Sequence, residues 1–252
     1  MKIAILFVGQ IRTFRKCLPN LSKFLLHLEA ETFLYSDSST TVEEDKVFCR
    51  NLFDHTKFED DPEFKDYSSS PGRIEHYQFV DWHRRIVSQI YKNWCAWKMI
   101  SGKQYDVVIR VRPDIILSRK LEVLNFIKPS TLYIPRSDNH FGLNDRFGIG
   151  DYNVMKSYMC RYEDLDDYLN YGGILHSEEN LKYSMLKNKH SFKPLNNLHV
   201  TIRRENEDLP ITISRYDKLL WLYQKIPHIR DKRNWKKKYE NLFDWYSAKD
   251  MK

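Results

Sequence analysis

The chain has 252 residues, of which 42 % are hydrophobic and 30 % are charged, close to ordinary globular usage. A chain of this length can bury a core without metals or disulfides, so the composition excludes disorder of the chain as a whole. No apolar run approaches the roughly eighteen residues of a membrane span, which predicts a soluble protein. Of the net charge of +7, residues 230–238 carry +5, so a nucleic-acid footprint spread over the whole protein is excluded.

A continuous apolar run over residues 2–8 predicts a first strand, of the kind that is buried on both faces of a parallel sheet. Leucines at helical spacing (Leu18, Leu21, Leu25, Leu28) predict a helix, with Pro19 in its first turn. Residues 32–36 predict a second strand. Such a strand–helix–strand unit favours a right-handed parallel crossover.

Residues 54–71 are acidic, and the run Ser-Ser-Ser-Pro-Gly covers 68–72, which together predict a mobile surface loop over 54–71. A long amphipathic helix follows over 79–97 and stops before Gly102. The remaining predicted elements are strands at 105–112, 132–135 and 199–203, and helices at about 152–170, 178–188 and 215–226. Strands that alternate with helices predict an α/β domain with a mostly parallel sheet.

In open α/β sheets, ligands bind beyond the carboxyl ends of the strands, and three polar segments are expected there. The first is Gly9-Gln10-Ile11-Arg12, directly after the first strand. Gly9 allows close backbone approach, and Arg12 can contact a phosphate with two N–H groups. The segment is not a G-x-G-x-x-G fingerprint, so a dinucleotide is not expected. An arginine on a surface turn explains Arg12 equally well.

The second segment is Arg110-Val111-Arg112-Pro113-Asp114, at the end of the strand predicted at 105–112. Strand alternation places Arg110 and Arg112 on the same side, where two buried guanidinium groups need anions. Asp114 beside them resembles the carboxylate of a Mg²⁺ or Mn²⁺ diphosphate site. An internal salt bridge between Asp114 and either arginine is the alternative.

The third segment combines a glycine-hinged loop at 144–151 with His-Ser-Glu-Glu-Asn-Leu at 176–181. Ser177 has the position of a helix cap, and two acids in the first turn suit the positive end of a helix dipole. Glu178 at such a terminus is also a candidate general base for a hydroxyl group. Both explanations stay open at this point.

These segments, in this order and spacing, resemble a family of GT-A-fold glycosyltransferases found in bacterial surface-polysaccharide clusters and in large DNA viruses that glycosylate their own capsids. The resemblance covers about residues 2–203. It implies a GT-A-like domain over 1–203 with a Rossmann-like, mostly parallel central sheet flanked by helices. Residues 204–252 are expected to form a helical, basic and aromatic extension packed on it.

The resemblance implies a hexosyl- or pentosyltransferase that moves a sugar from a UDP- or GDP-linked donor to a hydroxyl group of a glycan acceptor. Donor binding is assigned to Gly9, Gln10, Arg12, Arg110, Arg112 and Asp114. Asp114 occupies the place of a D-x-D motif and is the expected ligand of one Mn²⁺ or Mg²⁺, although one carboxylate stands where that motif has two. Acceptor binding is assigned to Arg146, Phe147 and Gly148, and the catalytic base to Glu178 or else Asp145.

Two other functions fit the sequence. A sugar-phosphate nucleotidyltransferase would share the sheet and the metal, but no long glycine-rich, lysine-bearing loop follows the first strand. A non-enzymatic module would bind nucleic acid or membrane through the basic C-terminal segment. Residues 230–245 resemble an amphipathic helix suited to peripheral membrane contact. Four widely spaced cysteines without a C-x-x-C pair favour a reducing compartment, the cytoplasm, or the host cytoplasm for a viral protein.

Overall fold

A computed structural model describes residues 1–70, 81–118, 120–121, 126–136, 142–195 and 198–203. Within these ranges, seven strands form one sheet in the order β3-β2-β1-β4-β7-β6-β8. The strands of this sheet are β1 (Ile3–Val8), β2 (Glu31–Ser36), β3 (His55–Phe58), β4 (Val107–Val111), β6 (Thr131–Pro135), β7 (Phe147–Gly150) and β8 (Ser191–Leu195). The sheet is mostly parallel, and β7 runs antiparallel to both of its neighbours.

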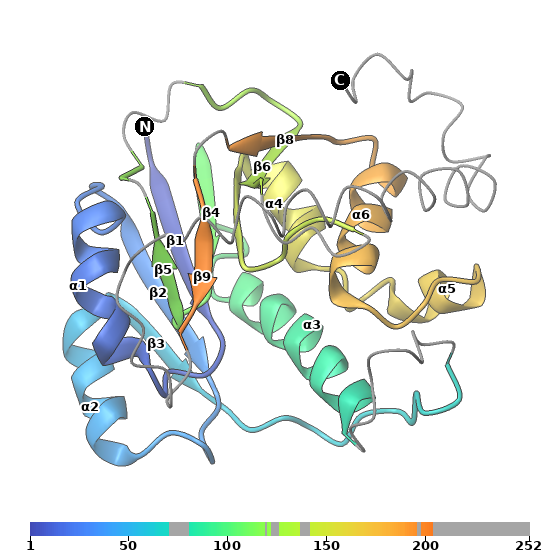
Figure 1. The fold of residues 1–252 in the computed structure, drawn as a ribbon, viewed down its shortest axis with the longest axis horizontal. Coiled ribbons are helices and arrows are strands. Elements are labelled where there is room, and N and C mark those ends of the chain that lie inside the picture. The colour runs from blue at the N-terminus through green and yellow to red at the C-terminus, as the bar shows by residue number, and fades with distance from the viewer. Residues whose placement is uncertain (71–80, 119, 122–125, 137–141, 196–197, 204–252) are drawn as a thin grey trace, which may run out of the picture.

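Helices and a two-stranded ribbon cover the two faces of the sheet (Figure 1). On one face lie α1 (Phe14–Phe24), α2 (Glu43–Leu52) and the antiparallel pair of β5 (Ile115–Leu117) and β9 (Val200–Ile202). The other face carries α3 (Trp82–Lys98), α4 (Tyr152–Met159) and α6 (Ser177–Lys187), and α5 (Leu165–Asn170) packs against α6. The molecule is therefore an α/β protein with a mostly parallel sheet between two layers, as the sequence predicts.

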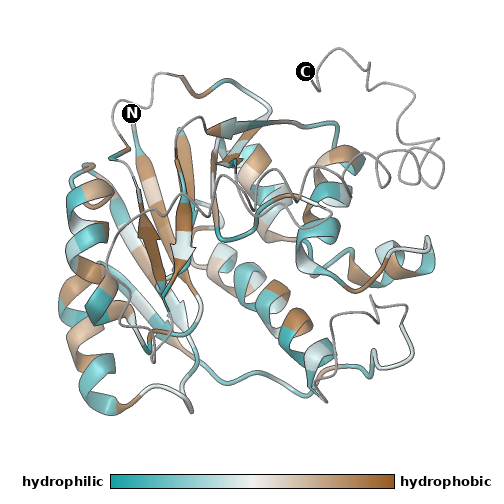
Figure 2. Ribbon diagram, in the orientation of Figure 1, coloured by the Kyte–Doolittle hydropathy of each residue, from teal (hydrophilic) through white to brown (hydrophobic). Residues whose placement is uncertain are grey.

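Strand alternation divides the core into two clusters. Along β1, Ile5 and Phe7 face α1 and α2, whereas Leu6 and Val8 face α3, α4 and α6. Figure 2 shows hydrophobic residues along the central strands and a mixture of both kinds along each helix. Every residue of β1 is buried, which explains its continuous apolar run. No helix in the described part of the chain has the length and hydropathy to cross a membrane.

The first helix begins at Phe14 rather than near Leu18, so Pro19 lies inside the helix and not in its first turn. Phe14 and Cys17 are buried in the core, and this burial outweighs the backbone hydrogen bond that a proline cannot donate. Asn20 exchanges two hydrogen bonds with the backbone of Leu117, at 2.9 and 2.8 Å. This pair of bonds ties α1 to β5.

The prediction of a loop over residues 54–71 is wrong for 55–58, which form β3. This strand lies at the edge of the sheet and pairs in parallel with β2, with Phe33 opposite His55. Its residues alternate between exposed and half-buried, so the strand has no buried hydrophobic row that a sequence pattern reveals. Further along the segment, Tyr67 is buried against α3 and α5 residues.

The prediction of a loop over 144–151 is wrong for 147–150, which form β7 between β4 and β6. Its glycines are required by packing rather than by a hinge. A Cβ atom on Gly148 would lie 2.9 Å from the ring of Tyr158, and one on Gly150 would lie 3.1 Å from the carbonyl oxygen of Thr131. Close approach of neighbouring groups is a known reason for glycine in a strand.

Two of the remaining predicted elements differ from the observed ones. The helix predicted over 152–170 is two helices, α4 and α5, and the strand at 199–203 pairs with β5 outside the main sheet. The start of the long helix at 79–80, the helix at 215–226 and the whole segment 204–252 lie outside the described residues. Predictions about the C-terminal extension and its membrane contact therefore stay predictions.

Candidate functional site

The carboxyl ends of β1 and β4 lie side by side where the strand order reverses (Figure 1). From β1 the chain adds β2 and β3 on one side, then returns through α3 to β4 on the other side of β1. In open α/β sheets this switch point is where ligands bind. The topology therefore places the candidate site beyond the carboxyl ends of β1 and β4, in the middle of the sheet.

A crevice of about 410 Å³ opens at this point. Its described wall comes from the ends of β1, β2 and β4 and from one face of α3. Among the described lining residues, five side chains are cationic and one is acidic: Arg12, Arg85, Lys92, Arg110 and Arg112 against Asp37. The other lining residues are Val8, Gly9, Gln10, Ser88 and Gln89. We call this set the cationic crevice.

Gly9 joins the carboxyl end of β1 to that of β2. Its φ of +133° is a conformation that residues with a side chain rarely adopt. Its N–H donates to the carbonyl oxygen of Tyr35 at 3.2 Å, which joins the end of β1 to the end of β2. A Cβ atom at Gly9 would lie 3.5 Å from Cδ of Pro113. Gly9 thus positions Gln10 and Arg12 beside the residues that follow β4.

Arg110 forms the buried base of the cationic crevice, with 1 % of its surface exposed. Its Nε donates to Oδ1 of Asn93 at 3.0 Å, and its Nη1 donates to the backbone carbonyl of Asp145. A buried guanidinium group needs such fixed partners. The neighbouring α3 residue Asn93 and the segment before β7 therefore hold Arg110 in one orientation.

Asp145 is the centre of a buried polar network behind the crevice wall. Its carboxylate accepts hydrogen bonds from Gln89 and Ser177, and its backbone carbonyl also accepts from Tyr158 at 2.7 Å. Burial alone would raise the pKa of Asp145, but the charges of Arg110 and Arg161 and the Ser177 hydroxyl lower it. A carboxylate with a lowered pKa is a weak base, so this geometry suits a positioning role for Asp145.

Arg112 and Asp114 form a two-pronged ion pair at the end of β4. Nε of Arg112 donates to Oδ1 of Asp114 at 2.8 Å, and Nη2 donates to Oδ2 at 2.7 Å. Burial would raise the pKa of Asp114, but the Arg112 guanidinium outweighs it and holds the pKa below its usual value. The internal salt bridge that the sequence left open is therefore present, and Asp114 lies behind Arg112 rather than among the residues that line the crevice.

A second cluster of charges joins Asp37, directly after β2, to Lys92 on α3. Lys92 is buried and lies 2.5 Å from Oδ1 of Asp37, 3.2 Å from Asp61 and 2.7 Å from Oγ of Ser88. Oδ2 of Asp37 is buried and has no hydrogen-bond partner among the described residues. A buried acceptor of this kind carries a desolvation cost that a ligand hydroxyl or N–H group can relieve.

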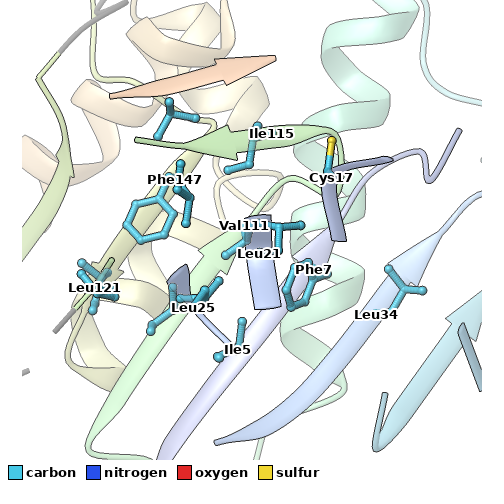
Figure 3. Close-up of a cluster of buried hydrophobic side chains, with 14 of the residues drawn as sticks. Ile5, Phe7, Cys17, Leu21, Leu25, Leu34, Val111, Ile115, Leu121 and Phe147 are labelled. Atoms are coloured by element: carbon cyan, nitrogen blue, oxygen red, sulfur yellow. The ribbon is translucent and has the colours of Figure 1, made fainter. Parts of the chain in front are cut away.

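The structure brings together five of the residues that the sequence assigned to donor binding: Gly9, Gln10, Arg12, Arg110 and Arg112. The residues assigned to the acceptor do not join them. Phe147 is fully buried beside Val111 and Leu121 in the core (Figure 3), and Gly148 is enclosed in β7. Neither residue offers a surface to an acceptor. Arg146 is half-buried, and its carbonyl accepts the Arg112 N–H at 3.1 Å.

Glu178 is buried in the first turn of α6 and does not line the described wall of the cationic crevice. Its carbonyl accepts the N–H of Leu143 at 3.0 Å, and a Cβ atom on Gly142 would collide with it. Ser177 does not cap the helix, because its hydroxyl donates to Asp145 instead. The assignment of Glu178 as catalytic base remains a prediction.

Sequence reasoning missed the α3 contribution to the site. Arg85, Ser88, Gln89 and Lys92 follow an i, i+3, i+4, i+7 pattern, so they share one face of the helix. The sequence shows these polar residues at helical spacing, on the face opposite the apolar residues that predict the helix. Asp37 was also missed, although it directly follows the second predicted strand, where the rule used for the first strand applies equally.

The divalent cation implied by the resemblance does not fit the carboxylates at this site. Both oxygens of Asp114 bind Arg112, and Oδ1 of Asp37 contacts Lys92. In the described part of the chain, no group of three or more His, Cys, Asp or Glu side chains is placed to hold a metal ion. Asp114 therefore acts here as the partner that orients Arg112.

The fold and the site together define an α/β protein with a cationic crevice at the switch point of a mostly parallel sheet. Residues 80–204 of the 252 are similar to a family described as a domain of unknown function, DUF7796. The matched stretch supplies Arg85, Lys92, Arg110 and Arg112, but not the residues after β1 and β2. No curated protein matches the chain.

Proposed function

We propose that this chain is a glycosyltransferase of GT-A-like fold, which transfers a sugar from a UDP- or GDP-linked donor to a hydroxyl group of a glycan. The observation that carries the proposal is the cationic crevice. Its position at the switch point suits a nucleotide, and its cationic side chains suit a diphosphate. The strand order β3-β2-β1-β4 supports the fold assignment.

The side chains of the crevice suit the departure of a diphosphate. When the bond to the anomeric carbon breaks, negative charge grows on the leaving phosphate while the sugar becomes oxocarbenium-like. Arg110 and Arg112 are already fixed by Asn93 and Asp114, so they need little reorganisation to stabilise that charge. Preorganised groups of this kind supply much of the rate enhancement in charge-separating reactions.

Asp37 gives the donor a second point of contact. Asp37 lines the crevice, and its buried Oδ2 has no hydrogen-bond partner among the described residues. A ribose or sugar hydroxyl at Oδ2 would satisfy this oxygen, while Lys92 fixes the other oxygen of the same carboxylate. The site would then prefer ligands that carry such a hydroxyl over analogues that lack it.

The acceptor hydroxyl must lose a proton in an inverting reaction, and Glu178 stays our proposed base. Asp145 is the less suitable residue because, despite its burial, the charges of Arg110 and Arg161 lower its pKa, which makes its carboxylate a weaker base. Substitution Glu178→Gln should therefore lower kcat about 100-fold or more and leave the affinity for a nucleoside diphosphate unchanged. Equal turnover by the variant would remove Glu178 from the mechanism.

Product analysis separates the proposal from its alternatives. The full chain is incubated with UDP- and GDP-sugars, and release of the nucleoside diphosphate is measured with and without glycan acceptors. A parallel reaction contains nucleoside triphosphates and a sugar 1-phosphate. The proposal predicts diphosphate release in the first reaction. Pyrophosphate release in the second reaction alone would identify a nucleotidyltransferase, and inactivity in both would favour a binding module.

A further inference from the structure

The charges around the cationic crevice are unbalanced. Lys92 is compensated by Asp37, at 2.5 Å, and by Asp61. Arg12 and Arg85 are exposed at the crevice and form no hydrogen bond or ion pair through their side chains with another described residue. Arg112 is paired with Asp114, and Arg110 is 1 % exposed, so among the described lining residues Arg12 and Arg85 carry the uncompensated positive charge. Their guanidinium groups match phosphate oxygens in shape and charge.

The carboxylates near this surplus are already engaged. A Mg²⁺ or Mn²⁺ ion in a diphosphate site is normally held by one or two carboxylates together with the phosphates. Binding by Asp114 would require it to give up both hydrogen bonds from Arg112, which would leave that guanidinium group without its partner. Oδ2 of Asp37 has no such bond, but an ion there would lie next to the Lys92 ammonium group.

We infer that the cationic crevice binds the diphosphate of its ligand without a divalent cation. The uncompensated guanidinium groups of Arg12 and Arg85 supply the positive charge that a metal ion supplies elsewhere, while Arg112 keeps its two bonds to Asp114. A dication placed among them would be repelled, since like charges close together in a partly buried site are weakly screened. This inference rests on the proposed function, because it takes the ligand to be a nucleoside diphosphate.

The test is calorimetric titration of the full chain with UDP and with GDP. One series contains EDTA and the other contains Mn²⁺ or Mg²⁺, with ionic strength matched by NaCl because salt alone weakens charge–charge binding. We expect affinity in EDTA to equal or exceed the affinity with metal. A gain of more than about threefold on adding either metal would overturn the inference and leave the proposed function intact. Failure of both nucleotides to bind in either series would overturn the proposed function itself.

Two further readouts address the metal and the arginines separately. Electron paramagnetic resonance of Mn²⁺ should keep its free-ion signal when the protein is added, and quenching of that signal would contradict the inference. In EDTA, Arg12→Gln should weaken UDP or GDP binding about tenfold, the loss expected for one charged phosphate contact. Arg15→Gln is the matched control, because Arg15 on α1 pairs with Asp45 on α2 and does not line the described wall of the crevice. Equal affinities of the two variants would contradict the role given to the guanidinium groups.

Discussion

At the scale of single residues, the site depends on pairs of charges that fix one another. Asp114 holds Arg112, and Asp37 holds Lys92. In each pair the cation lines the crevice. Asp114 acts through the position of Arg112, whereas Asp37 also lines the crevice itself. Breaking a buried pair costs more than the pair itself contributes, because the remaining charge is left without compensation. Stability measurements therefore test these pairs independently of activity.

Substitution Asp114→Asn should destabilise the protein at pH 7 by about 3 kcal/mol, because it leaves Arg112 without its carboxylate. The pKa of Asp114 is lowered in the folded protein. Its ionised form therefore contributes fully above the ordinary carboxyl pKa of about 3.9, and the contribution is lost as pH falls through the lower folded-state pKa. Urea denaturation between pH 7 and pH 3 should show the two proteins converging at the acidic end. A constant difference would show that the carboxylate charge is not involved.

Substitution Lys92→Met should cost about 3–5 kcal/mol of unfolding free energy, because the buried Asp37 then loses the cation beside it. Lys65→Met is the matched control, since Lys65 forms an exposed ion pair with Asp166 at 2.9 Å. Exposed pairs contribute less than about 1 kcal/mol. Similar losses for both variants, measured by chemical denaturation, would show that the Lys92 cluster is no more important than a surface pair.

At the scale of helices and strands, the order of the elements follows from hydrophobic periodicity, but several boundaries do not. Strand β1 and helix α3 have strong patterns because they lie against the core. Strand β7 was missed because its two glycines resemble a hinge, although the Tyr158 ring and the Thr131 carbonyl require them. Helix α4 ends at Met159, and just beyond it the buried side chain of Arg161 bonds the carbonyls of Tyr158 and Ser177. A contact between segments distant in sequence leaves no local signal.

The position of the candidate site was predictable from the sequence, but the contacts of its side chains were not. The residues after β1 and β4 were located by a topological rule that needs only the strand positions. The choice between a metal ligand and a salt bridge for Asp114 was not predictable, because it depends on the rotamer of Arg112. Phe147 was assigned to the acceptor because its segment was predicted as a loop. The segment is strand β7, and Phe147 is buried in the core.

Substitution Gly9→Ala should cost about 1–3 kcal/mol of unfolding free energy, because φ is +133° at this position. It should also weaken nucleotide binding by displacing Gln10 and Arg12. Gly102→Ala is the control, since Gly102 has a φ of +85° and nothing within 4 Å of an added Cβ. This control should lose stability and keep its affinity. Unchanged binding by the folded Gly9 variant would show that the turn after β1 does not shape the site.

Substitution Phe147→Ala should cost about 3–5 kcal/mol, the usual loss for a fully buried phenylalanine. Phe126→Ala should cost much less, because 37 % of Phe126 is exposed. Thermal and urea denaturation measure both. A small loss of unfolding free energy for Phe147→Ala, together with a raised KM for the acceptor, would show that Phe147 contacts the acceptor.

At the scale of the whole molecule, the cationic crevice joins elements from both helical layers. The segment after β1 leads into α1 on one face of the sheet, whereas Arg85 and Lys92 come from α3 on the other face. A ligand in the crevice would contact both layers and both halves of the doubly wound sheet. Binding should therefore raise the stability of the whole domain, by about 2.7 kcal/mol at a ligand concentration one hundred times Kd.

The proposed nucleotide site is tested most directly by the affinity of UDP and GDP for two neighbouring α3 variants, measured by calorimetry. Arg85 lines the cationic crevice, whereas Arg84 lines a separate cavity beside residues 61–68. We predict that Arg85→Gln weakens binding about tenfold and that Arg84→Gln, with the same change in net charge, leaves it unchanged. Equal affinities for the two variants, or a larger loss at Arg84, would contradict the claim that this crevice holds the nucleotide.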